Sequence, residues 1–419
     1  MGNLIPSLIT FIIVFGIIVS VHEYGHLFFA KRAGILVREY AVGMGPKIFA
    51  HRAKDGTLYT IRMVPVGGYV RMAGWADDTT EIKKGTPVSL AVADGEVVSR
   101  VNLSERVNID GGVPMLVTDY DFEKALFIEG EVFGEVKRFP VQHDATIIEE
   151  DGTELRIAPI DVQYQSATIM GKILTNFAGP LNNFILGLIA FIILTFMQGG
   201  VPSNSNQIGT IQPNTPAAQA QLKSGDKIVA VDGKATQDWN AVVSAISGSA
   251  GHEMSLDIQR GGQEKSLKLK PEKLDGSYRI GIVNAMKTGV FDMLAGGFIQ
   301  AGNAATAIFR ALGSLITHPN LNKLGGPVAI FQMSGQAAQG GMLTIIYFLA
   351  MLSINLGIVN LIPIPVLDGG KIVLNLIEAV RGKPLSQEKE GIITLIGVAF
   401  MVLLMVAVTW NDIMRWIGH

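Results

Sequence analysis

The chain has 419 residues, of which 48% are hydrophobic and only 17% charged, a composition that excludes a single soluble globular domain and indicates a membrane protein with soluble parts. The formal net charge of −2 gives no reason to expect a nucleic-acid partner. The absence of cysteine excludes disulfides and thiolate metal sites, so His, Asp and Glu remain as metal ligands.

The N-terminal segment combines a long apolar run with a metal-binding motif. Residues 1–33 are predicted to form one membrane helix, in which the apolar run ends at His22-Glu23-Tyr24-Gly25-His26. On a helix, His22 and His26 lie one turn apart on the same face and can hold a zinc ion, while Glu23 can act as a base toward water. Because ionisable residues inside a span are costly and usually functional, a metal site is favoured over a merely polar helix end.

Three further apolar segments predict membrane helices: residues 169–199, 341–371 and 390–412. Lysine and arginine dominate residues 34–78, which follow the first helix, and recur between the last two helices. The positive-inside rule therefore places these connections in the cytoplasm and both termini outside it.

The regions around the second helix predict two kinds of β structure. In residues 34–78, strand-like stretches flank the turn signal Val64–Gly68, and the spacing alone favours a simple surface hairpin. Residues 79–168 alternate short apolar runs with Asp-Gly and Gly-Gly turns, which predicts a β-rich cytoplasmic insert.

Asparagines lie within the second and third predicted helices, at Asn176, Asn182 and Asn183 and at Asn355 and Asn360. Asparagines at membrane depth need hydrogen-bond partners. The pattern leaves open whether those of the second helix bond to neighbouring helices or hold an extended peptide.

Residues 203–285 are predicted to form a soluble module outside the cytoplasm. Strands are expected at Ile208–Ile211, Met254–Gln259 and Lys265–Leu269, with a helix at Trp239–Ile246. The run Ser224–Gly233 resembles that of PDZ domains, and the order of elements is similar to the circularly permuted bacterial type. Such domains bind peptide ends by strand addition; a spacer without a ligand is the alternative. Residues 290–340 are predicted as an interfacial helix and a linker.

A third zinc ligand is expected at the end of the third membrane helix, because two histidines leave a catalytic zinc one protein ligand short. Pro363 and Pro365 stop helical hydrogen bonding there, so Asp368 is presented at a helix break, where irregular backbone is tolerated only if buried or lining a cavity. The first and third helices run in the same direction, which places Asp368 at the depth of His22. These arguments favour a ligand over an ordinary turn aspartate.

Together, His22–His26 and Leu367-Asp368-Gly369 resemble the site-2 protease family of intramembrane zinc metalloproteases. The PDZ-like module resembles the bacterial RseP-type branch, and residues 79–168 look like the insert of its Gram-positive form. Further matches are Gly67-Gly68-Tyr69, Ala178-Gly179-Pro180 with Asn183, Leu324–Pro327, and Asn355 with Asn360. Departures are the single PDZ domain and Lys371, which stands where a histidine often follows the two glycines.

The resemblance implies a polytopic α-helical membrane protein with four transmembrane helices, a membrane-associated β-loop, the β-rich insert and one extracytoplasmic PDZ domain. It implies Zn²⁺ held by three ligands with a catalytic Glu23, and a substrate segment bound by the loop and three asparagines. These residues are His22, His26 and Asp368 for the metal, and Gly67, Gly68, Tyr69, Asn183, Asn355 and Asn360 for the substrate.

The implied substrates are single-span proteins of the cell membrane already shortened outside, such as anti-sigma factors or remnant signal peptides, cut in regulated intramembrane proteolysis. Two other classes stay open at this stage. One is a metal or proton transporter, and the other is a PDZ membrane scaffold with an inactive protease core.

Overall fold

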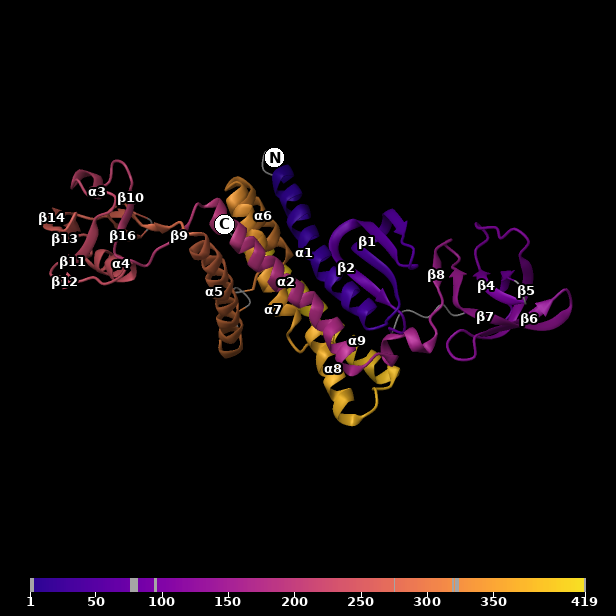
Figure 1. Ribbon diagram of the computed structural model, residues 1–419. Coiled ribbons are helices and arrows are strands. Elements are labelled where there is room, and N and C mark those ends of the chain that lie inside the picture. Colours follow the sequence, from indigo (N-terminus) through magenta and orange to yellow (C-terminus); the bar gives the residue numbers. More distant parts are fainter. Residues whose placement is uncertain are drawn as a thin grey trace. The chain divides into compact units, whose positions relative to one another are not determined.

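The computed structural model describes residues 4–75, 82–93, 96–274, 276–318, 320 and 324–417. Four of its helices are long and apolar enough to cross a membrane, as expected: α1 (Leu4–Arg32), α2 (Ile169–Met197), α7 (Met342–Asn360) and α9 (Gln387–Ile417) (Figure 1). The chain forms two compact units, residues 1–190 with 301–419, and residues 191–300.

Glycines allow α2 to approach α1 and α7 closely. A Cβ at Gly25 of α1 would lie 2.3 Å from the carbonyl oxygen of Ala178 on α2, and one at Gly187 of α2 would lie 2.6 Å from the side chain of Ile354 on α7. Small residues are the usual means of bringing helix backbones together in a membrane. Asn182 adds a hydrogen bond from its amide nitrogen to the carbonyl of Val21, at 2.9 Å, next to the metal motif.

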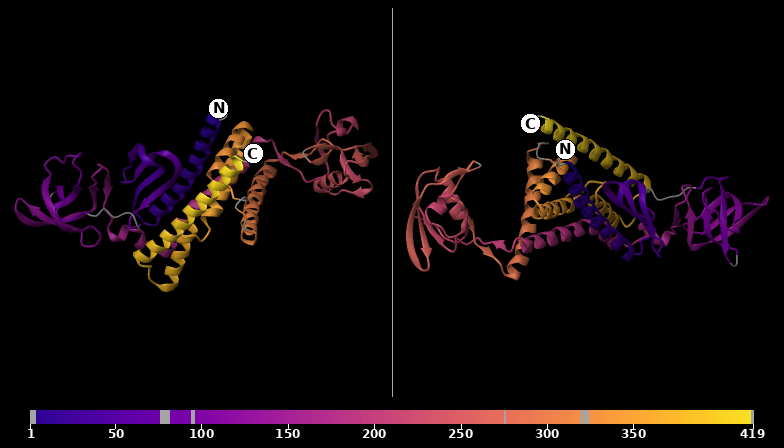
Figure 2. Two further views of the ribbon diagram at one scale, coloured as in Figure 1. Left: turned by 180° about the vertical axis from the view of Figure 1, so that it is seen from behind. Right: turned by 90° about the horizontal axis from the view of Figure 1, so that it is seen from above.

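A curled antiparallel pair, β1 (Val37–Arg52) and β2 (Leu58–Met72), packs against α1 (Figure 2). Residues 39–42 of β1 pair both with residues 58–61 and with residues 68–71 of β2. The expected turn at Val64–Gly68 is therefore wrong. Although Gly67 has a φ of +73°, Val64 remains paired with Met44, so this stretch bends the strand without ending it.

A buried carboxylate connects the two ends of β2. Glu39 accepts hydrogen bonds from Thr60 Oγ1 at 2.7 Å, Arg62 Nη2 at 2.6 Å and Tyr69 Oη at 3.1 Å. Burial by itself would raise the pKa of Glu39, but the hydrogen bonds from Thr60 and Arg62 hold it below its ordinary value. The ionised carboxylate thus joins the residue 58–62 and residue 68–72 segments.

The insert has a six-stranded sheet in the order β4-β3-β5-β6-β7-β8, and an extra pairing of β4 with β7 closes five strands into a ring. The β-rich structure thus occurs where the turn pattern predicts it; residues 79–81 and the turn at 94–95 lie outside the described residues. The elements are β3 (Pro87–Ala93), β4 (Val97–Asn102), β5 (Val113–Asp121), β6 (Phe127–Val132), β7 (Glu135–Ile148), β8 (Glu154–Arg156), and the 3-10 helices Ile160–Val162 and Tyr164–Ser166.

The unit of residues 191–300 holds a four-stranded sheet in the order β12-β11-β13-β14, with a core that includes Val242 of α4, Leu256 and Ile258. Its strands and helix lie within two residues of the expected positions. The elements are β9 (Val201–Pro202), β10 (Ile208–Ile211), α3 (Pro216–Gln219), β11 (Lys227–Val231), β12 (Lys234–Ala235), α4 (Trp239–Gly248), β13 (Met254–Arg260), β14 (Gln263–Leu269), β15 (Glu272–Leu274), β16 (Ser277–Arg279), β17 (Ile282–Asn284) and β18 (Met286–Lys287).

The sequence predicts a linker after the interfacial helix, and the structure corrects this prediction. Helix α5 (Val290–Thr317) is followed by a second packed helix, α6 (Pro327–Gln339). Ser334 of α6 donates a hydrogen bond to the carbonyl of Ser7 on α1, at 3.1 Å. The buried Asp412 of α9 accepts the backbone N–H groups of Gly326 and Ala329, which caps the start of α6. The third membrane helix ends at Asn360 and not at residue 371 as predicted, and a further helix that the sequence did not predict, α8 (Asp368–Arg381), begins at the expected third ligand.

Candidate metal centre

Three side chains from two distant parts of the sequence converge. His22 and His26 on α1 place their Nε2 atoms 3.2 Å apart, and Oδ2 of Asp368 lies 3.3 Å from the first and 3.5 Å from the second. Both histidines are buried and the aspartate is partly buried. The prediction that these three residues come together is therefore confirmed as geometry.

The triangle has the size that zinc requires. Tetrahedral zinc with bonds of about 2.0–2.1 Å separates its ligand atoms by about 3.3 Å. The three observed separations lie within a few tenths of an ångström of this value. Two imidazoles and one carboxylate therefore fit a zinc ion and leave its fourth position for water or substrate.

Helix α2 forms the back of this site. Nδ1 of His26 donates to the backbone carbonyl of Thr175, at 2.7 Å, which leaves its Nε2 free to bind a metal. A Cβ at Gly179 would lie 2.3 Å from Nε2 of His26 and 2.8 Å from Cε1 of His22. Only glycine therefore allows both rings to lie against this turn of α2.

Asp368 is held by a tight chain reversal between α7 and α8. A Cβ at Gly369 would lie 2.3 Å from the carbonyl oxygen of Leu361, and one at Gly370 would lie 2.1 Å from that of Ile364. The two glycines thus let the start of α8 fold back on the end of α7. This geometry explains the Asp-Gly-Gly sequence: it presents the carboxylate at the first residue of a helix.

A cavity of about 330 Å³ opens onto the three side chains. It is lined by the metal-binding group, by Glu23, and by residues of β2 and α7, namely Gly67, Gly68, Tyr69, Val70 and Asn360. Gly68 lies close to α1, since a Cβ there would come within 3.0 Å of the Glu23 side chain.

Two of the asparagines expected at the substrate lie elsewhere. Asn355 is exposed on α7 and does not line the cavity. Asn183 is fully buried, with its amide nitrogen 3.0 Å from Nδ1 of His22.

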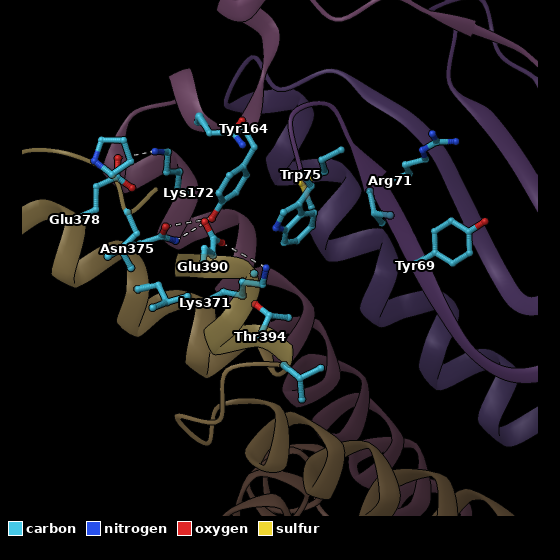
Figure 3. A pocket seen from close by; sticks show the side chains of 18 of the residues that line it. Tyr69, Arg71, Trp75, Tyr164, Lys172, Lys371, Asn375, Glu378, Glu390 and Thr394 are labelled. Carbon is cyan, nitrogen blue, oxygen red and sulfur yellow. Dashed lines mark hydrogen bonds and ion pairs between the residues drawn. The ribbon is translucent and has the colours of Figure 1, made fainter. Parts of the chain in front are cut away.

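A second cavity, of about 560 Å³, adjoins the first and shares Tyr69, Val70, Met72, Trp75 and Val366 with it. Figure 3 shows the Trp75 and Tyr164 rings facing each other and Lys371 directed toward Trp75. The centroids of the two rings lie 5.3 Å apart. Lys371 also pairs with Glu390 of α9 at 3.7 Å.

Sequence reasoning missed Lys172 and Glu378, two charged residues that line this second cavity. Lys172 is 2% exposed and pairs with Glu378 of α8 at 2.7 Å. The sequence does contain a signal for this ion pair: Lys172 stands near the start of a predicted membrane helix, where an unpaired charge is costly, so a charged partner could have been expected.

Comparison with known proteins identifies the family of this chain. Residues 10–404 match the model of peptidase family M50. The chain belongs to this family. A protein of Lactococcus lactis subsp. lactis, provisionally named a zinc metalloprotease, is 68% identical over 98% of this chain and 99% of its own length. A protein of Enterococcus faecalis, provisionally named the protease Eep, is 54% identical over 98% of this chain and 99% of its own.

Among solved structures, the PDZ domain of an SdrC-like protein from Listeria monocytogenes is similar to 20% of this chain and 88% of its own, with 24% identity and a TM-score of 0.18.

Membership of family M50 confirms several expectations. The chain is a zinc metalloprotease of the site-2 type, its cofactor is Zn²⁺, and it is a multi-pass membrane protein. The transporter alternative is thereby set aside.

Proposed function

We propose that this M50 protein is an intramembrane endopeptidase that cuts the transmembrane segments of pre-trimmed single-span membrane proteins. The observation that carries the proposal is the convergence of His22, His26 and Asp368 on one cavity that Glu23 also lines. The two histidines and Glu23 lie on α1, a helix apolar enough to cross a membrane. The scissile bond would therefore be met at membrane depth.

His22, His26 and Asp368 hold the zinc ion in this proposal, and Glu23 is the catalytic base. When bound, zinc supplies Lewis-acid polarisation of the scissile carbonyl and lowers the pKa of water. Glu23 takes the proton of the attacking water and later delivers it to the leaving amine. The apolar residues of the cavity wall, such as Phe15 and Leu356, limit the number of waters that compete for this position.

Segment 68–72 of β2 is the proposed docking edge for the substrate backbone. In the described part of the chain its strand partner is β1 alone, and its residues Gly68, Tyr69 and Val70 line the catalytic cavity. A helical substrate hides its carbonyls in hydrogen bonds, so it must unwind before cleavage. An unwound segment can replace those bonds by pairing with this edge. Asn360, at the end of α7, lines the same cavity and is placed to position the substrate segment, whereas Asn355 lies outside the cavity lining.

The charge distribution supports the proposed sidedness. Basic residues 34–78 and the connection from α8 to α9 are assigned to the cytoplasm, and residues 203–285, as a PDZ domain, to the outside. Substrates such as anti-sigma factors or remnant signal peptides would arrive after removal of their outer parts. An active protease core is favoured over an inactive scaffold because all three proposed ligands and the base are present.

The test is Glu23→Gln in the full-length protein, purified and reconstituted with a single-span substrate. Cleavage should fall by at least about 10³-fold, since the base is lost. Zinc content should stay at the wild-type level, because no ligand is removed. Near-normal turnover by this variant would refute the assignment.

A further inference from the structure

Asn183 occupies an unexpected position behind the metal site. It lies on α2, eight residues after Thr175, and its side chain is fully buried. Its amide nitrogen is 3.0 Å from Nδ1 of His22, on the side of the ring opposite the metal-binding Nε2. Its amide oxygen, Oδ1, is buried and has no hydrogen-bond partner among the described residues.

This arrangement conflicts with metal binding. An amide nitrogen is a donor only, so it can bond to Nδ1 only if that atom is unprotonated. A neutral imidazole would then carry its hydrogen on Nε2, where it would block the zinc ligand. Zinc binding through Nε2 requires the reverse: Nδ1–H must point at an acceptor.

Rotation of the Asn183 amide by 180° removes the conflict. The oxygen and nitrogen of a primary amide have nearly the same size, so the exchange moves no other group. After the rotation, the amide oxygen, which has no partner in the present orientation, would accept the Nδ1–H of His22. The same change pairs the buried oxygen with His22, and the amide nitrogen takes the position that the oxygen occupies here.

We infer that Asn183 is a positioning residue whose amide oxygen accepts the Nδ1–H of His22 and fixes this ring as an Nε2 zinc ligand. The carbonyl of Thr175 already does this for His26. Residues 175, 179 and 183 are spaced by four, so one face of α2 orients His26, gives room to both rings at Gly179, and orients His22.

Helix α7 holds Asn183 in place for this role. Ser353 Oγ donates to the backbone carbonyl of Asn183, at 2.8 Å, and both residues are fully buried. Gly357 of α7 lies beside Asn183: a Cβ added at Gly357 would be 3.4 Å from the Cβ of Asn183. Asn183 therefore faces the metal site and not the substrate cavity, whose lining does not include it.

The inference rests on the proposed zinc ligands, and zinc binding tests it without any substrate. Full-length Asn183→Asp and Asn183→Leu proteins would be titrated in detergent with Zn²⁺ against a competing chelator. Aspartate can accept but not donate, so Asn183→Asp should keep zinc affinity within about 3-fold of wild type or strengthen it. Leucine removes the acceptor and should weaken zinc affinity 10- to 100-fold.

Asn360→Leu is the matched control, since Asn360 lines the cavity: it should raise KM while leaving zinc affinity unchanged. Co²⁺-loaded protein gives a second readout, because a reoriented His22 changes the ligand-field absorption bands. An Asn183→Asp protein that loses zinc as severely as the leucine variant would overturn the inference, as would Asn183→Leu with unchanged affinity. If the leucine variant fails to fold, the aspartate result decides by itself.

Discussion

Asp368 shows how a single residue combines structure and chemistry. It is the first residue of α8, and its Oδ2 completes the triangle with the two histidine nitrogens. Asp368→Asn replaces a charged ligand by a weak neutral one, so zinc content and cleavage should both fall at least 10-fold. Metal analysis of the purified variant beside wild type gives the measurement. Full occupancy with unchanged activity would point to a different third ligand.

Glu39 holds the proposed docking edge directly, through its hydrogen bond from Tyr69. Removing one partner of a buried ion pair costs about 3 kcal/mol or more, so Glu39→Gln should speed hydrogen exchange in residues 58–62 and 68–72 and slow cleavage. The double variant Glu39→Gln/Arg62→Gln removes both charges of the 2.6 Å pair and should recover part of the loss. A double variant no better than the single one would show that the pair is not the connection.

The pH dependence of the same edge follows from the pKa of Glu39. Hydrogen bonds hold that pKa below its ordinary value despite burial, so the carboxylate contributes stability that is complete above the ordinary pKa. This stability is lost as the pH falls through the lowered pKa of the folded state. The hydrogen-exchange protection factors of residues 68–72, which are corrected for the intrinsic effect of pH on exchange, should therefore fall on acidification below about pH 4. In Glu39→Gln this fall should be smaller; an equal fall would assign it to other groups.

The metal ligands could be predicted from sequence because their signals are local. Two histidines one turn apart and a proline-broken helix end are visible in a few residues. The place of Asn183 could not be predicted in this way. Asn183, Asn355 and Asn360 all look like polar residues in apolar helices, and only the packing of α2 on α1 shows that the first faces a histidine.

At the scale of elements, α2 packs against both histidines of the zinc site, and the closest approach is at Gly179. Gly179→Ala would place a Cβ 2.3 Å from Nε2 of His26, so zinc affinity should fall more than 10-fold as the rings are displaced. Gly16→Ala on α1 is the control, because nothing lies within 4 Å of a Cβ there. Chelator competition on both proteins measures the difference. Equal affinities in the two variants would show that the rings can adjust.

The elements that sequence reasoning missed have two different physical causes. Residues Val64–Gly68 contain turn-forming residues, yet pairing with β1 keeps them within β2. Helices α6 and α8 are shorter than a membrane span and only partly apolar, so their sequences contain no long apolar run that would predict a helix. The long apolar helices α1, α2, α7 and α9 were predictable because their length and hydropathy are intrinsic.

At the scale of the molecule, the module of residues 203–285 is a separable part. It lies within the compact unit of residues 191–300 and has its own buried core. Its two ends are joined, because β9 pairs with β18 through Pro202 with Met286 and Val201 with Lys287. A short Gly-Ser linker between Pro202 and Met286 can therefore replace the module.

We expect the module to select substrates by the size of their outer part. The proposed sidedness assigns the module to the outside, the side from which a bulky ectodomain would arrive, so we expect it to affect substrate entry and not the chemistry. Deletion of residues 203–285 should raise cleavage of a substrate with an intact ectodomain more than cleavage of the same substrate pre-trimmed. Both substrates would be assayed with reconstituted wild-type and deleted enzymes, with zinc content as the control for folding. Equal loss on both substrates would make the module a structural support, and equal rates before and after deletion would remove it from substrate selection.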